Sequence, residues 1–249
     1  MAEQDPYVFD SIAKVYDSTR ALPQDVMDQV VEALFRQLDG SHRILDVGVG
    51  TGRFAVPLSE RGLRIVGIDL AEEMMAKARD KGFGSLVRAS ATQMPFEGAS
   101  FDAATMVHVL HLIPDWRKAL SEVSRTVVGS LYTVATERER NHAPRAVYER
   151  LLEELGYGPA FLGVHERDLA KILRPDDIWP VCRYEETLET DEMIGAISRR
   201  EFSWATRLPD GLHDQVVQEI REKCVQKKES IMHSMLVYRW EARRLANLP

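Results

Sequence analysis

The chain has 249 residues, of which 45% are hydrophobic and 29% charged, and its formal net charge is −7. This composition is typical of a globular protein that can bury a full hydrophobic core. The negative charge gives no electrostatic reason to expect a nucleic-acid partner. No stretch reaches the roughly 18 apolar residues that a membrane span needs, and the N-terminus does not form a signal peptide. We therefore expect a cytoplasmic protein with neither nucleic-acid nor membrane partners.

The first 136 residues show the periodicity of helices and buried strands. Apolar side chains share one helical face in residues 9–16, and Pro23 begins a second amphipathic helix that Gly40 ends. The chain then alternates between amphipathic stretches and five short apolar runs, at 42–47, 64–69, 85–89, 101–107 and 130–136. This alternation predicts a parallel sheet with helices on both faces, doubly wound through right-handed crossovers.

The rhythm changes after residue 136. Residues 137–208 contain short helices, a Gly/Pro turn and an extended segment at 179–188, and we interpret them as an inserted, mainly helical cap. A helix at 209–227 and an apolar strand at 231–240 follow, and we expect that strand to join the sheet edge antiparallel. The prediction is an α/β, Rossmann-like, doubly wound sheet of seven mostly parallel strands with the last strand antiparallel. It divides into a lid and core (1–136), a cap (137–208) and a return to the core (209–249).

A glycine cluster follows the first predicted strand. Residues 46–52 read Asp-Val-Gly-Val-Gly-Thr-Gly and open a helix. Glycines allow a sharp turn and let a ligand approach the backbone, and this corner of a doubly wound sheet is a ligand site. A dinucleotide site has the pattern G-x-G-x-x-G, but here the third glycine comes one residue early. Asp46 would repel a diphosphate but suits a cationic amino group. The corner therefore favours a zwitterion, such as the methionine part of S-adenosylmethionine, over a nicotinamide dinucleotide.

An acidic residue ends the second predicted strand. Asp69 lies about 20 residues beyond the glycines, where a carboxylate can accept hydrogen bonds from both ribose hydroxyls. The alternative is that Asp69 caps the helix that begins near Ala71. The upstream glycine corner favours the ribose.

Residues 44–135 resemble the class I S-adenosylmethionine-dependent methyltransferases, in particular the small-molecule branch that includes the quinone-biosynthesis C-methyltransferases. Four segments carry the resemblance in the family's order: ILDVGVGTGRF, GIDLAEEMMAKAR, ATQMPFEGASFD and HVLHLIPDWRKALSEVSR. The resemblance implies S-adenosylmethionine as the cofactor and a small molecule as the methyl acceptor. It is vague in the predicted cap.

The resemblance also implies a set of cofactor-binding residues. Asp69 would bind the ribose, Leu70 would pack on the adenine, and Val107 would hold the amino group through its carbonyl. Ser90 departs from the aspartate common in the family and would accept the adenine's hydrogen bond with less charge. In chain order the set is Arg20, Asp46, Gly48, Gly50, Thr51, Asp69, Leu70, Ser90, Ala91, Val107 and His108.

Two residues are candidates for catalysis. His111 follows the fourth strand, where the methyl group points in the family, and a neutral imidazole there can accept a proton from the acceptor. It can equally pack, or cap the next helix. Tyr16 lies in an N-terminal segment that often folds over the cofactor as a lid, although it can also be a core residue. Arg20 of the same segment can pair with the cofactor's carboxylate or remain exposed.

Two further questions stay open at the level of sequence. The leading alternative function is a non-catalytic S-adenosylmethionine-binding sensor or partner protein, which an occluded cap would favour. Aromatic residues of the cap can line a pocket for a hydrophobic or aromatic acceptor, or form a core. Cys182 and Cys224 have no metal-ligand spacing and no acidic cluster stands out, so we expect no metal.

Overall fold

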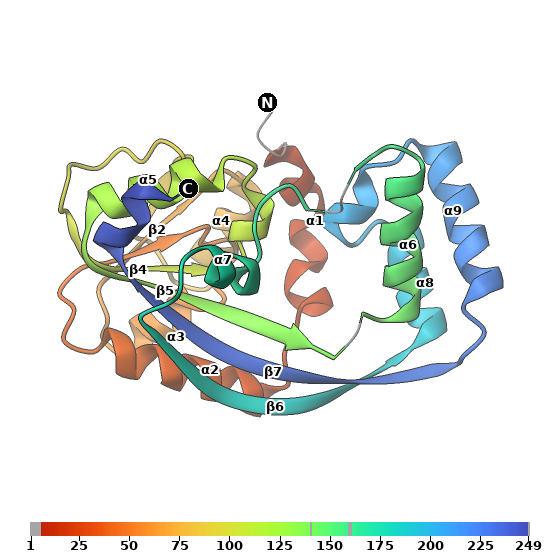
Figure 1. Cartoon of the computed structure of the whole chain (residues 1–249), viewed down its shortest axis with the longest axis horizontal. Helices are drawn as coiled ribbons and strands as arrows, with labels where there is room; N and C mark the ends of the chain where they lie inside the picture. The colour runs from red at the N-terminus through yellow and green to blue at the C-terminus, as the bar shows by residue number, and fades with distance from the viewer. Residues whose placement is uncertain (1–5, 140, 159–160, 249) are drawn as a thin grey trace.

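The computed structural model describes residues 6–139, 141–158 and 161–248. Seven strands form one sheet: β1 (Ile44–Val47), β2 (Ile65–Asp69), β3 (Leu86–Arg88), β4 (Phe101–Val107), β5 (Val127–Arg138), β6 (Asp177–Glu189) and β7 (Lys228–Glu241). Their order in space is β3-β2-β1-β4-β5-β7-β6 (Figure 1). The first five strands are parallel, and β7 runs antiparallel to both of its neighbours. The predicted seven-stranded, mostly parallel sheet with an antiparallel last strand is confirmed.

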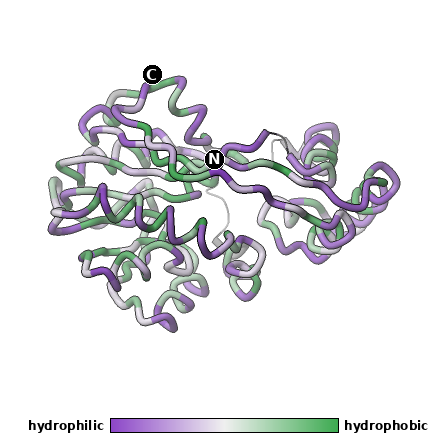
Figure 2. The backbone as a smooth tube through the Cα atoms, turned by 90° about the horizontal axis from the view of Figure 1, so that it is seen from below, coloured by the Kyte–Doolittle hydropathy of each residue, from purple (hydrophilic) through white to green (hydrophobic). Residues whose placement is uncertain are grey.

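Helices cover both faces of the sheet. One face packs against α2 (Gln24–Leu38), α3 (Ala55–Glu60) and α4 (Glu72–Asp80), and the other against α5 (Trp116–Thr126), α7 (Glu166–Ile172) and η3 (Ala242–Asn247). These helices form because their apolar residues recur every three or four positions, so that one stripe is buried. The backbone hydropathy in Figure 2 accordingly changes between hydrophilic and hydrophobic along the helices. In the described part of the chain, no helix has the length and apolar character needed to cross a membrane.

A cap stands beside the sheet domain at the far end of the long strands β6 and β7 (Figure 1). It consists of α6 (Ala143–Glu154), α8 (Thr190–Ser198), η2 (Ser203–Thr206) and α9 (Asp210–Lys223). The buried side chains of these helices pack together as a separate core, with Tyr148, Trp204 and Ile220 among its members. The cap is therefore a small helical unit carried by an extension of the sheet.

The structure corrects the predicted organisation in three places. The last strand, β7, is not at the sheet edge, because it lies between β5 and β6. Residues 179–188, assigned by sequence to the cap, lie in β6, which is the edge strand. The helix expected to return to the core, α9, packs within the cap. Pairing between β6 and β7 joins residues about 40 to 60 positions apart, and α9 packs on helices that are also distant in sequence. No local pattern reveals either kind of contact.

The N-terminal helix α1 (Pro6–Thr19) lies between the sheet domain and the cap (Figure 1). Near its start, the Asp10 carboxylate accepts a hydrogen bond from the backbone N–H of Glu73 in the first turn of α4, at 2.9 Å. Carboxylates are favoured at helix N-termini, where backbone N–H groups lack partners. This contact fixes α1 over the carboxyl ends of the first strands.

Candidate active site

The glycine corner after β1 has backbone angles that residues other than glycine adopt only with strain. Gly48, Gly50 and Gly52 have φ angles of +75°, +54° and +72°. This left-handed region is open to glycine because it lacks a Cβ atom. At Gly48 a Cβ would also lie 2.4 Å from Cγ2 of Val109, far inside van der Waals contact. The corner therefore brings the backbone close to the end of β4.

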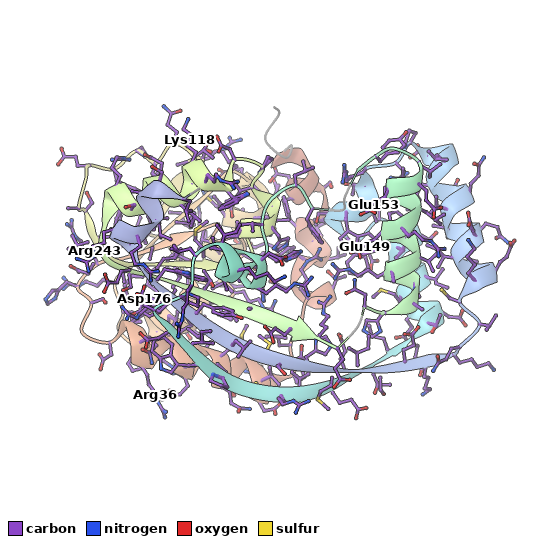
Figure 3. All side chains as sticks on the ribbon, viewed as in Figure 1. Arg36, Lys118, Glu149, Glu153, Asp176 and Arg243 are labelled. Atoms are coloured by element: carbon purple, nitrogen blue, oxygen red, sulfur yellow. The ribbon has the colours of Figure 1, made fainter. Side chains whose placement is uncertain are left out.

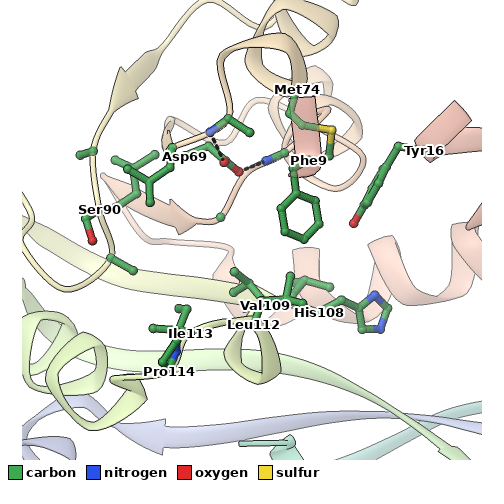
Figure 4. Close-up of a pocket in the computed structure, with 18 residues that line it drawn as sticks. Phe9, Tyr16, Asp69, Met74, Ser90, His108, Val109, Leu112, Ile113 and Pro114 are labelled. Carbon is green, nitrogen blue, oxygen red and sulfur yellow. Dashed lines mark hydrogen bonds between the residues drawn. The ribbon is translucent and has the colours of Figure 1, made fainter. Parts of the chain in front are cut away.

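Asp69, at the end of β2, holds this corner in place. Its Oδ2 accepts a hydrogen bond from the N–H of Gly50 at 2.8 Å, and its Oδ1 accepts one from the N–H of Ala71 at 2.9 Å (Figure 4). Ala71 itself is the N-cap residue of α4, so Asp69 is not that helix's cap. Burial raises the pKa of the Asp69 carboxyl. Because a carboxylate offers about four acceptor positions, Asp69 keeps capacity for a ligand beyond these backbone bonds.

A cavity of about 830 Å³, including its mouth, opens beside this corner. In Figure 4, Phe9 and Tyr16 of α1 face Ser90 across the cavity, and Val109, Leu112 and Ile113 form another wall. A polar corner next to apolar walls fits a ligand with a charged or hydroxylated part and a flat apolar part.

Nine of the sequence-predicted site residues line this cavity. They are Tyr16, Gly48, Gly50, Asp69, Leu70, Ser90, Ala91, Val107 and His108. They come from α1 and from the ends of β1, β2 and β4 and the loop after β3, which are neighbours in the sheet. The four other predicted residues, Arg20, Asp46, Thr51 and His111, are not among the lining residues.

Asp46 lies beneath the corner. Its carboxylate is 6% exposed and accepts a hydrogen bond from the Thr105 hydroxyl on β4 at 2.7 Å. Burial raises the pKa of Asp46 to about 6, and the nearby charge of Asp69 adds to the effect. The Asp46 carboxyl can therefore gain or lose its proton in response to a change of pH or to a nearby cation.

Thr51 connects the corner to α1. Its hydroxyl donates a hydrogen bond to Asp17 Oδ1 at 2.6 Å, and Lys81 Nζ lies 2.7 Å from Asp17 Oδ2. Lys81 also donates to the carbonyl of Thr51 at 2.9 Å. These contacts hold α1 over the cavity, in the position where the sequence predicted a lid.

Arg20 joins α1 to the cap. Its guanidinium lies over the ring of Tyr16 at 4.6 Å and over that of Phe202 at 5.5 Å. It also donates a hydrogen bond to the carbonyl of Glu201 at 3.4 Å. Burial lowers the pKa of Arg20. Arg20 therefore does not line the cavity itself but contacts Tyr16, which does.

The two predicted histidines lie in different surroundings. His108 lines the cavity with φ of +56°, and its Nε2 is 3.2 Å from the hydroxyl of Thr136. Burial, followed by the charges of Arg53 and Arg138, lowers the pKa of His108 to about 3, so its imidazole is neutral.

His111 lies in the short helix η1 (Leu110–Leu112). Its ring stacks on His165 with centroids 5.0 Å apart and meets the edge of Phe161 at 4.6 Å. Burial holds the pKa of His111 well below its usual value. The packing of its ring is the role that the sequence gave as the alternative to catalysis.

A second cleft, of about 1190 Å³, lies between the end of β5, α6 and the segment before α7. Thr136, Arg138, Arg145, Phe161 and His165 line it, with several glutamates. In Figure 3, Glu149 and Glu153 point from α6 toward the sheet domain. Because His108 lines the first cavity and its partner Thr136 lines the second, this pair stands between the two.

Sequence reasoning missed two kinds of site residue. The apolar wall formed by Phe9, Met74, Val109, Leu112 and Ile113 resembles an ordinary core pattern, so nothing in the sequence marked it. Arg53 does not line the cavity, but its charge helps to lower the pKa of His108, which does. The Nη2 of Arg53 is buried and has no hydrogen-bond partner among the residues that the structure describes. Its position directly after Gly52 was the available signal.

The fold is doubly wound, and its cavity lies at the carboxyl ends of β1, β2 and β4, where folds of this class bind their ligands. Comparison with known proteins agrees. A family described as a methyltransferase domain matches residues 45–129. A demethylmenaquinone methyltransferase of Corynebacterium glutamicum (strain R) is 33% identical over 141 residues, which cover 53% of this chain and 61% of that protein. The O-methyltransferase resE of Aspergillus sclerotiorum is 29% identical, covering 68% of this chain and 71% of that protein.

A solved structure shows the same fold. A SAM-dependent methyltransferase of Thermotoga maritima superposes with a TM-score of 0.54 at 19% identity, covering 95% of this chain and 99% of that one. The predicted resemblance to the class I S-adenosylmethionine-dependent methyltransferases, and to quinone-biosynthesis enzymes among them, is confirmed. The chain spans 52% to 61% of the length of the demethylmenaquinone methyltransferases that it matches.

Proposed function

We propose that this protein binds S-adenosylmethionine in the cavity beside Asp69 and transfers its methyl group to a small molecule. The supporting observation is the meeting of three cofactor-like surfaces in one cavity. The Asp69 carboxylate keeps acceptor sites for ribose hydroxyls, Leu70 and Ile113 offer apolar surface to the adenine, and Val107 lies at the end of β4 for the amino group. The family match over residues 45–129 contains all of these residues, whereas the α1 wall of the cavity lies outside it.

The acceptor would arrive through the second cleft. When bound, the cofactor supplies an electrophilic methyl group on a sulfonium, and the protein's task is to align an acceptor with it. The pair formed by His108 and Thr136 separates the two cavities, so the transferred group would pass close to these side chains. Helix α1, held by Asp17 and Arg20, would keep water away from the reacting atoms.

Tyr16 is the stronger of the two catalytic predictions. Its ring lines the cavity, and in Figure 4 its hydroxyl faces the side where His108 lies. Burial raises the pKa of Tyr16, so its hydroxyl stays protonated and would orient the acceptor through a hydrogen bond. The role of His111 stays a prediction, to be tested by His111→Ala once an acceptor is known. The finer expectations of a cytoplasmic location and of no nucleic-acid partner also remain proposals.

The first test is calorimetric binding of S-adenosylhomocysteine, the product of methyl transfer. Asp69→Ala should weaken binding about 10- to 150-fold, because hydrogen bonds to a charged group contribute about 1.5–3 kcal/mol. Asp102→Ala is the matched control, since Asp102 also accepts two backbone N–H bonds, from His42 and Arg43, but at the start of β4. Equal affinities of the two variants, or tight binding of NAD, would contradict the proposed site.

Turnover separates an enzyme from the sensor that the sequence left as an alternative. The comparisons give that alternative no support. Incubation with S-adenosylmethionine and a panel of phenols, quinols and amines should release S-adenosylhomocysteine with at least one acceptor. Binding of the cofactor without release across a broad panel would favour the sensor.

A further inference from the structure

Three side chains from separate segments meet where the cap joins β6 and β7. His142 precedes α6, Glu186 belongs to β6 and His233 to β7. Their ligand atoms all lie within 4.8 Å of one another. Oε2 of Glu186 is 3.3 Å from Nε2 of His142 and 2.9 Å from Nε2 of His233. We name these three residues the cap-base cluster.

Backbone pairing sets this arrangement. Tyr184 of β6 lies opposite His233 of β7, and the two rings stack at 4.8 Å. Glu186, two residues further along β6, is therefore a diagonal neighbour of His233 on the same face of the sheet. His142 reaches that face from the turn before α6, whose first N–H, that of Ala143, is held by the carboxylate of Glu229. The positions of the three residues are thus set by the pairing of β6 with β7 and by the start of α6.

Both imidazoles are buried with bonding capacity left over. His142 is 4% exposed and His233 1% exposed. Nε2 of His233 makes no hydrogen bond within the described chain, although Oε2 of Glu186 is close, and Nδ1 of each ring also lacks a partner there. Buried polar atoms without partners cost free energy and are uncommon. The short separation without a hydrogen bond means that the ring nitrogen does not point at the carboxylate oxygen.

We propose that the cap-base cluster binds one divalent transition-metal ion of the zinc class. Two imidazoles and one carboxylate are a ligand set that such ions accept, with a further position left for water. Metal–ligand bonds of about 2.0–2.2 Å at tetrahedral angles separate the ligand atoms by about 3.3–3.5 Å. The separations of 3.3 Å and 2.9 Å at Glu186 are close to that value.

Such an ion would tie together the start of α6, β6 and β7, and so fix the cap on its strands. Arg138 of β5 lies opposite His233 in the strand register, and its positive charge works against a bound cation. With one carboxylate and three protein ligands, the site is expected to bind more weakly than closed four-ligand zinc sites. The ion would therefore stabilise a cap that already has its own core.

The test is metal uptake by the full chain after treatment with a chelator. Co²⁺ should bind at one equivalent and give the visible absorption bands of a low-coordinate site. Zn²⁺ at 100 times its dissociation constant should shift the folding equilibrium about 100-fold, which corresponds to a rise in Tm of about 5–10 °C. These measurements need neither cofactor nor acceptor, so their outcome is independent of the proposed methyl transfer.

Variants assign the uptake to the cluster. Glu186→Gln keeps the size of a partly exposed side chain and removes its charge, and should weaken metal binding by at least about tenfold. Glu185→Gln is the matched control, because Glu185 is exposed on the other face of the same strand. His42→Gln, at an exposed histidine far along the chain, checks for binding to surface imidazoles. The proposal is overturned by absent saturable uptake in the natural protein, or by equal affinity in Glu186→Gln.

Discussion

The cofactor corner and the cap are built on different principles. In the corner, function depends on backbone: glycines with positive φ, N–H groups held by Asp69, and strand ends brought together by parallel pairing. The cap and the second cleft are formed by side chains from helices and strands that are distant in sequence. The methyltransferase domain match ends at residue 129, before the cap begins.

This difference explains how one fold can serve many acceptors. A backbone-built corner tolerates little change, because residues other than glycine are strained at its positive φ angles. A cap with its own core can change its lining residues without disturbing that corner. Arg20 connects the two regions, because its guanidinium contacts both Tyr16 of α1 and Phe202 of the cap.

The largest effect is expected from emptying the cap core. Trp204 is 3% exposed and packs against Tyr148 and Phe202, so Trp204→Ala should cost about 3–5 kcal/mol of unfolding free energy. If the two regions are independent, S-adenosylhomocysteine affinity should change less than about threefold, well under 1.4 kcal/mol. Denaturant unfolding and calorimetry measure the two quantities.

Leu155→Ala is the matched control, because this apolar side chain of the cap is 42% exposed. Its substitution should change stability by no more than about 0.5 kcal/mol. A tenfold loss of cofactor affinity in Trp204→Ala alone would show that the cap supports the corner.

The next effect concerns the corner itself. Gly48→Ala places a Cβ against Val109 and keeps a left-handed backbone. We expect the clash and the backbone strain together to weaken S-adenosylhomocysteine binding by about 2–3 kcal/mol, or about 100-fold. Adding Val109→Ala should restore the steric part and leave the backbone part. Calorimetry on both variants separates the two terms, and an unaffected single variant would show that the corner is not rigid.

The pH dependence of cofactor binding should then report the ionisation of the Asp46 carboxyl. Its pKa of about 6 means that the carboxyl is neutral below that pH and cannot attract the cofactor's ammonium. Affinity for S-adenosylhomocysteine should therefore fall as pH drops below about 6, by at most about tenfold, or 1.4 kcal/mol, per pH unit. Asp46→Asn should bind more weakly with a flat profile. A sloping profile in that variant would assign the titration to another group.

The smallest effect is expected at the lid. Asp17→Asn weakens the contacts with Thr51 and Lys81, which are partly exposed and so contribute roughly 0–1 kcal/mol. Affinity should fall about two- to fivefold, and hydrogen exchange in residues 6–19 should become faster. Glu72→Gln, which removes an exposed ion pair with Arg79, should change neither. Unchanged exchange in Asp17→Asn would mean that other contacts hold the lid.

The sequence by itself determined the cofactor half of this protein. The strands through residue 136, the glycine corner and Asp69 are local patterns in which strand, turn and helix follow within about ten residues, so periodicity and glycine spacing reveal them. Eight of the predicted site residues then meet in one cavity, because parallel strands place their carboxyl ends at one edge, and Tyr16 joins them from α1.

Tertiary structure alone decided the rest. The edge position of β6, the packing of α9 in the cap, and the contact of Thr51 with Asp17 all join residues that are far apart in sequence or lack a distinctive pattern. The cap-base cluster shows the reason most clearly. His142, Glu186 and His233 lie more than 40 positions from one another, so no ligand spacing marks them. Antiparallel pairing of β6 with β7 brings Glu186 and His233 together, and His142 joins them from the turn before α6.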